Sequence, residues 1–239
     1  MISQKALPRY GEAFLRLFYP SLCASCDQLL ELKDQGLCFA CHKNLEKFKL
    51  SSSKERIRTS LPYGDSTWTL FHYEGIVKEI FHQIKFGKRR DLLQIFTPFI
   101  ESFFTERANP LFSYDLILAV PLDLRRRLKR EFNQSDIIAS RIRQILGKRL
   151  TSPQFFLEKI ILTKQRSTPP QSLLGRKERL LNLGQVFRVL HPLFVRGKSI
   201  LLVDDIFTTG ATLEEAAKVL RESGASGIDY FVLARSLGD

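Results

Sequence analysis

The sequence predicts an α/β domain with a mainly parallel sheet, preceded by a small unit built around four cysteines. Apolar runs of strand length alternate with stretches whose apolar residues recur at helical spacing. The chain has 239 residues, 44% hydrophobic and 26% charged, so it can bury a substantial core. Its four cysteines all fall within residues 23–41. We expect two units, an N-terminal helix with the cysteine region over 1–55 and the α/β domain over 61–239, joined by a Ser- and Lys-rich linker at 49–60.

The first elements of the larger unit are a strand and two helices. Residues 68–73 alternate between apolar and polar side chains as a strand does. Ile76, Ile80 and Ile84 then recur at helical spacing, and a second helix is predicted over 92–104. Lys85 could face a site, whereas Phe86 is expected in the core.

The remaining elements continue the alternation. Residues 114–120 form a near-continuous apolar run that ends at Pro121, as expected for a strand buried on both faces of a parallel sheet. Asn133 or Ser135 would cap the helix that follows. The pattern then predicts a polar, Pro-containing loop within residues 160–190, a strand over 199–203, a helix over 213–223 closed by Gly224, and a strand over 228–234.

Composition and charge exclude some classes of protein and favour others. The chain contains no apolar stretch near the roughly 18 to 20 residues that a membrane span needs and no signal-peptide pattern, so we expect a cytoplasmic protein without membrane contact. The net charge is +12, with eighteen basic against five acidic residues in 121–199. Such a block favours a phosphate-rich partner, either a small molecule or a nucleic acid, although a solvated basic surface explains it equally well.

The cysteine spacing predicts a structural metal site. Cys23 and Cys26 form one Cys-x2-Cys pair, Cys38 and Cys41 form another, and eleven residues separate the pairs. Four thiolates suit a tetrahedral Zn²⁺ ion and leave no open position for catalysis. An iron–sulfur cluster is the rival interpretation, while disulfides are disfavoured in the cytoplasm.

A second motif predicts a phosphate-binding loop. The strand at 200–203 ends in Asp204 and Asp205, followed by a small, hydroxyl-rich loop that opens a helix. Backbone N–H groups at the helix start, together with threonine hydroxyls, would cradle a phosphate, and the paired carboxylates would bind sugar hydroxyls or Mg²⁺. The alternative is an ordinary strand–turn–helix with a threonine cap. The loop residues are Thr208, Thr209, Gly210, Ala211 and Thr212.

The segment 203–212 resembles the phosphoribosyl pyrophosphate (PRPP) motif of type I phosphoribosyltransferases. Together with the four cysteines and the sequences around Tyr73, Lys85, Pro121 and Asn133, it makes the chain resemble the ComF family of competence-associated proteins, from about residue 19 to residue 234. One position departs from the family pattern, since Glu131 stands where a glycine is usual.

The resemblance implies a type I phosphoribosyltransferase-like fold and a set of site residues. Asp204 and Asp205 would be the catalytic residues and would bind PRPP with the following loop, in the presence of Mg²⁺. Leu122, Arg125, Arg126 and Arg127 would bind pyrophosphate. A hood loop at 165–179 would close over the ligand.

Two functions are compatible with this resemblance. The first is PRPP binding, with transfer of phosphoribose to an unknown acceptor if the protein is an active pentosyl glycosyltransferase linked to DNA uptake. The second is a non-catalytic module on the same fold that binds single-stranded DNA or a competence helicase-type partner.

Overall fold

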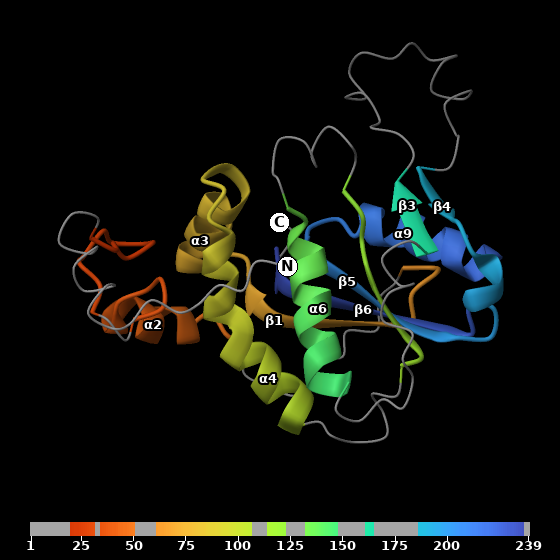
Figure 1. Ribbon diagram of the computed structural model, residues 1–239, viewed down its shortest axis with the longest axis horizontal. Helices are drawn as coiled ribbons and strands as arrows, with labels where there is room; N and C mark the ends of the chain where they lie inside the picture. Colours follow the sequence, from red (N-terminus) through yellow and green to blue (C-terminus); the bar gives the residue numbers. More distant parts are fainter. Residues whose placement is uncertain are drawn as a thin grey trace, which may run out of the picture.

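A four-stranded parallel sheet forms the centre of the computed structural model, which describes residues 20–31, 34–50, 61–106, 114–122, 132–147, 161–164 and 186–236. Its strands lie in the order β1-β6-β5-β2, and each neighbouring pair is parallel (Figure 1). The expected α/β architecture is therefore confirmed. The four strands are β1 (Ser66–His72), β2 (Leu116–Ala119), β5 (Ser199–Phe207) and β6 (Gly227–Arg235).

Strand β5 is longer than the sequence predicts. It was expected to end at Val203, but it continues to Phe207, which pairs with Arg235 of β6. Strand β2 does not accompany β5 over this last part. Its last residue, Ala119, pairs with Val203, and Pro121 follows two residues later. The last part of β5 is therefore held by β6 on one side and leaves its other side open at the carboxyl edge of the sheet.

Helices cover both faces of the sheet. One face packs on α3 (Gly75–Phe86), the 3₁₀ helix η1 (Arg90–Phe96), α4 (Thr97–Glu106) and α6 (Gln134–Gly147). The opposite face packs on α9 (Ala211–Glu222) and on an antiparallel ribbon of β3 (Leu162–Lys164) and β4 (Phe187–Val189), followed by η5 (Pro192–Phe194). Two separate hydrophobic clusters result, one on each side of the parallel strands.

Two expectations for individual elements need correction, and one element was not predicted. The helix predicted over 92–104 is a 3₁₀ helix followed by α4, and the change comes at Thr97 and Pro98, where proline lacks the N–H that a continuous α-helix would need. The β3–β4 ribbon, whose strands lie near the two ends of the 160–190 segment, was not predicted. The side chain of Phe86, expected in the core, is 70% exposed at the end of α3.

The cysteine region shares a hydrophobic cluster with the α/β domain. Leu45 of α2 (Phe39–Glu46) is fully buried, and Cys23 and Cys38 belong to the same cluster as the residues of α3 and α4. After α2 the chain runs beside β1, where the Leu50 N–H donates to the Leu70 carbonyl at 2.9 Å. The start of the expected linker therefore pairs with the sheet.

Several expectations fall outside the described residues. These are the N-terminal helix and the rest of the linker, 51–60. The division into units at residues 55 and 61 stays a prediction. Among the helices that the structure describes, none is both long and apolar enough to cross a bilayer.

Candidate functional site

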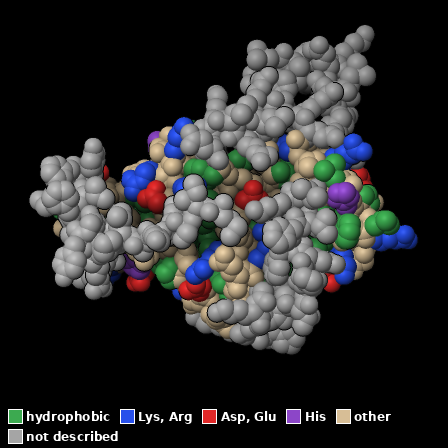
Figure 2. Space-filling view, viewed as in Figure 1, with side chains coloured by type: hydrophobic (Ala, Val, Ile, Leu, Met, Phe, Trp, Pro, Cys, Tyr) green, Lys and Arg blue, Asp and Glu red, His purple; other side chains and the backbone are tan. Residues whose placement is uncertain are grey.

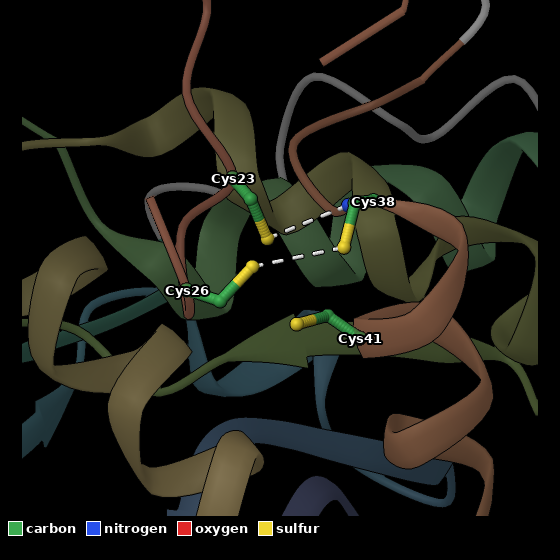
Figure 3. A group of neighbouring side chains, drawn as sticks. All are labelled: Cys23, Cys26, Cys38 and Cys41. Carbon is green, nitrogen blue, oxygen red and sulfur yellow. Dashed lines mark hydrogen bonds between the residues drawn. The ribbon is translucent and has the colours of Figure 1, made fainter. Parts of the chain in front are cut away.

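The four cysteines come together as the spacing predicts. Their sulfur atoms all lie within 4.8 Å of one another, and the Sγ atoms of Cys26 and Cys38 are 3.7 Å apart (Figure 3). Tetrahedral Zn²⁺ with Zn–S bonds of about 2.3 Å requires sulfur separations of about 3.8 Å. The donor set therefore fits a structural zinc ion, which Cys23, Cys26, Cys38 and Cys41 would hold.

Backbone geometry shapes the cluster. The first pair sits on a turn in which the Cys23 N–H donates to the Gln28 carbonyl at 2.8 Å and Asp27 has a positive φ of 57°. The Cys38 N–H then donates to the Cys23 sulfur at 3.4 Å. Although burial opposes it, donation from backbone N–H groups lowers the pKa of Cys23 to about 7. At Cys23 these donors favour the thiolate form that a metal ion binds, whereas burial raises the pKa of Cys41 to about 12.

A pocket of about 210 Å³ lies at the carboxyl edge of the sheet, where open α/β sheets bind ligands. Five separate parts of the chain meet there: Tyr73 with α3, the residues after β2, the start of α6, β3, and the end of β5 with the loop and first turn of α9 beyond it. Its polar lining residues are Tyr73, Lys85, Gln134, Ser135, Lys164, Asp204, Asp205, Thr208 and Thr212.

The paired carboxylates of β5 both line this pocket. Asp204 Oδ1 accepts hydrogen bonds from the Ser135 hydroxyl and the Asp205 N–H, each at 2.8 Å. Burial and the neighbouring Asp205 carboxylate raise the pKa of Asp204 to about 7. One carboxyl of the pair is therefore poised between its neutral and charged forms near neutral pH.

Asp205 has a cationic partner from the far end of α3. The Lys85 Nζ lies 3.0 Å from Asp205 Oδ2, and both side chains are mostly buried, with 19% and 12% exposed. This ion pair neutralises one of the two negative charges in the pocket. Burial and the Asp205 carboxylate also raise the pKa of Tyr73, so its phenol stays a hydrogen-bond donor.

The start of α6 is fixed against the same pocket by Asn133. Its side-chain amide donates to the Val120 carbonyl at 3.0 Å, and its Oδ1 accepts from the Ser135 N–H at 3.2 Å, as expected for a capping residue. Gln134 is 1% exposed, and its Nε2 has no hydrogen-bond partner among the described residues. A buried amide donor without a partner in a pocket is a position where a ligand oxygen would be favoured.

The loop after β5 turns sharply into α9. Gly210 precedes the helix with φ of 78°, and an added Cβ would lie 2.8 Å from the Phe207 ring and 2.9 Å from Leu61. The position therefore requires glycine. Thr208 and Thr209 are exposed, while Thr212 lines the pocket in the first turn of α9, where backbone N–H groups lack helical partners.

The structure brings only part of the expected site together. Asp204, Asp205, Thr208, Thr212 and Leu122 all line the pocket. The expected pyrophosphate-binding residues Arg125, Arg126 and Arg127, the position of Glu131 and the hood at 165–179 lie outside the described residues.

Sequence reasoning gave no site role to four polar residues of the pocket, Tyr73, Gln134, Ser135 and Lys164. Ser135 was considered only as a helix cap, and nothing in its local sequence indicates that it bonds to Asp204. Lys164 stands in a basic segment without any motif around it, and only the β3–β4 ribbon brings it to the pocket.

The basic residues of 121–199 are only partly covered by the structure. Six of the eighteen basic residues in 121–199 are described. Figure 2 shows that on the face viewed there, the described Lys and Arg side chains are scattered among other types.

Residues 161–238 match the model of the phosphoribosyl transferase domain. The "DNA utilization protein YhgH" of Escherichia coli K12 is 29% identical over 92% of this chain and its own full length. The "Competence protein ComFC" of Streptococcus pneumoniae is 28% identical over 90% of this chain and 87% of its own. The "Competence protein F" of Haemophilus influenzae is 26% identical over 92% of this chain and 99% of its own length. This chain is a homologue of these competence and DNA utilization proteins.

The phosphoribosyl transferase match lies within this chain itself, at residues 161–238. The expected resemblance to the ComF family is confirmed. The matched segment contains the Asp204 to Thr212 loop, whereas Lys85 and Ser135 precede it. Two solved structures also match in part. An "allosteric regulatory enzyme of purine biosynthesis" matches 59% of this chain with a TM-score of 0.38 and 18% sequence identity. A glutamine PRPP amidotransferase from B. subtilis matches 63% of this chain with a TM-score of 0.40 and 15% sequence identity. The match spans 26% and 30% of those chains.

Proposed function

We propose that this protein binds PRPP or a related phosphoribosyl ligand in the pocket at the end of β5. The observation that carries the proposal is the convergence of Asp204 and Asp205 with the first turn of α9 in one polar pocket of about 210 Å³. The carboxylates would accept hydrogen bonds from ribose hydroxyls, and the N–H groups of α9 would receive the 5′-phosphate.

The proposal extends to transfer of phosphoribose to an acceptor with release of pyrophosphate. Mg²⁺ held by the ligand oxygens and the paired carboxylates would supply charge stabilisation for the leaving group. The protein's own part would be to orient the ribose through Asp204 and Asp205 and to hold the phosphate at Thr208 and Thr212. The arginines at 125–127 are proposed to bind the pyrophosphate.

Calorimetric titration of PRPP with Mg²⁺ into the purified protein tests the binding proposal. Wild-type protein should release or absorb heat, and the double variant Asp204→Asn with Asp205→Asn should not. The variant should unfold within a few degrees of wild type, because these side chains serve the ligand rather than the core. The Glu215→Gln variant, which loses a carboxyl at an exposed position of α9 outside the pocket lining, is the control and should still bind. Equal binding by the double variant would refute the proposal.

A second candidate function is binding of single-stranded DNA, with a role in DNA uptake. The names of the relatives, "DNA utilization protein" and "Competence protein", support it, as does the excess of thirteen positive charges in residues 121–199. Titration with a short single-stranded oligonucleotide at two salt concentrations tests it. Affinity that falls steeply with salt would support DNA binding, and absence of binding at low salt would exclude it.

A further inference from the structure

Helix α3 connects the cysteine region to the ligand pocket. In Figure 1 it lies between the segment that contains α2 and the sheet. Two hydrogen bonds tie the first cysteine turn to this helix: the Ser25 hydroxyl donates to Glu79 Oε2 at 2.8 Å, and the Gln83 side-chain amide donates to the Ala24 carbonyl. Ala24 follows the metal-binding Cys23 directly and is 4% exposed.

The pocket end of the same helix carries Lys85. This residue is two positions beyond Gln83 and lies in the last turn of α3, which ends at Phe86. Its ammonium group pairs with Asp205 at 3.0 Å and lines the pocket. Two residues of an α-helix span about 3 Å along the axis, so the contact with the cysteine turn and the contact with the carboxylates belong to one helical turn.

The interior of α3 makes this turn a stiff connection. Ile80, Phe81 and Ile84 are fully buried, and the Phe81 ring lies 5.4 Å from that of Phe96. This packing holds the turn in one place while its outer contacts, through Gln83 and Lys85, are intact. The cysteine turn, in contrast, has few buried side chains of its own beyond the sulfur ligands, and the folding of such a turn is coupled to binding of its metal ion.

We propose that Lys85 is a positioning residue for the phosphoribosyl ligand and that the zinc-bound cysteine turn, acting through Gln83, sets its place. Lys85 holds Asp205 in orientation and offsets the negative charge that would otherwise repel a phosphorylated ligand. Loss of the metal, or of the Gln83 bond, loosens the last turn of α3 and weakens ligand binding although the pocket residues are unchanged. The identity of the ligand in this inference rests on the proposed function. The link to the cysteine turn rests on the contacts that α3 makes with that turn and with the pocket.

The first experiment tests the link itself and needs no ligand. Hydrogen exchange is followed at the amides of residues 83–87 in the zinc-loaded protein, in the protein stripped with a chelator, and in the Gln83→Leu variant. Stripping and the variant should both speed exchange there, while β6, on the far side of β1, keeps its protection. The Gln94→Leu variant makes the same chemical change at an exposed position of η1 and should leave exchange unchanged. Unchanged exchange after stripping would overturn the link.

The second experiment measures PRPP affinity in the presence of Mg²⁺. Lys85→Met should bind roughly 10- to 100-fold more weakly, because a charge-assisted contact is lost, and Lys85→Arg should recover most of the affinity. Lys78→Met removes a lysine from an exposed position of the same helix and should bind as wild type does. Gln83→Leu should bind roughly 3- to 10-fold more weakly at unchanged zinc content.

The two proposals fail in different ways. If wild-type protein does not bind PRPP, the proposed function fails, and the hydrogen-exchange experiment still decides whether the cysteine turn controls α3. If wild-type protein binds and Lys85→Met binds equally well or more tightly, the role of Lys85 is refuted while the proposed function stands. If Gln83→Leu also loses zinc, its faster exchange can result from loss of the metal. Exchange in wild-type protein stripped with a chelator then decides: faster exchange at residues 83–87 supports the link, and unchanged exchange refutes it.

Discussion

The cysteine cluster and the ligand pocket are built in opposite ways. All four sulfur ligands come from residues 23–41, and the short spacing within each pair brings them to within 4.8 Å of one another. The pocket takes its side chains from segments as far apart as Tyr73 and Thr212. A site assembled from neighbouring residues is recognisable from spacing, whereas a site assembled from distant elements depends on how the sheet and helices pack. Residues of both nevertheless pack in one hydrophobic cluster on the same face of the sheet.

The largest expected effect comes from breaking the cluster. Replacing Cys23 and Cys26 by Ser should release the bound zinc and unfold the cysteine region over about residues 20–45, because binding of a structural metal provides much of the folding free energy of such a unit. Metal analysis and hydrogen exchange would measure both. The matched variant Ser25→Ala, in the same turn, should retain the metal. Full metal retention by the cysteine variant would refute the zinc assignment.

The next effect tests how far the two regions depend on one core. Phe71 of β1 is fully buried and packs edge-on against Phe96 and Phe99, at 5.5 and 5.0 Å between ring centroids. Phe71→Ala should cost about 3–5 kcal/mol of unfolding free energy, as large cavities in packed cores do. Denaturant unfolding measures this cost. Because Lys49 pairs with Phe71, hydrogen exchange should also rise around α2.

Comparison of Gly210 with Gly197 separates the cost of backbone strain from the cost of close contact around an added Cβ. Both Gly210 and Gly197 have a positive φ, of 78° and 71°, but an added Cβ meets Phe207 and Leu61 only at Gly210 and meets nothing within 4 Å at Gly197. Gly197→Ala should therefore cost about 1 kcal/mol from backbone strain alone, and Gly210→Ala roughly 1 kcal/mol or more beyond that. Equal losses of stability in the two variants would show that the contacts around Gly210 relax without cost.

A separate test concerns pH and the carboxylate pair. The pKa of Asp204 is about 7 in the folded protein, above the value near 4 for an unfolded aspartate. The folded state therefore binds the proton more tightly, and unfolding free energy should fall as pH rises from about 4 to about 7, by at most ~1.4 kcal/mol per pH unit. Urea unfolding of wild type and Asp204→Asn at several pH values isolates this contribution. PRPP binding, which needs the charged pair, should strengthen over the same range; an identical pH dependence in the variant would contradict the assignment to Asp204.

Several elements were predictable because their patterns are local. The strand at the centre of the sheet, the α9 helix closed by Gly224 and the cap at Asn133 follow from runs of apolar residues and from capping chemistry. The 3₁₀ helix before α4 was not predicted, since its buried residues Leu92, Leu93, Ile95 and Phe96 also suit an α-helix. The β3–β4 ribbon was missed because strands of three residues carry too short a pattern to recognise.

The sequence by itself determined the four thiolates, the adjacent carboxylates and the glycine turn, because each depends on residues close together in the chain. The tertiary structure decided what the carboxylates face. Lys85 arrives from α3, Ser135 from α6 and Lys164 from β3, and none of these is near Asp204 in sequence. It also decided that β5 extends past Val203, since only pairing with β6 keeps that segment in a strand. Long-range hydrogen bonding and packing made these choices, and no local pattern encodes them.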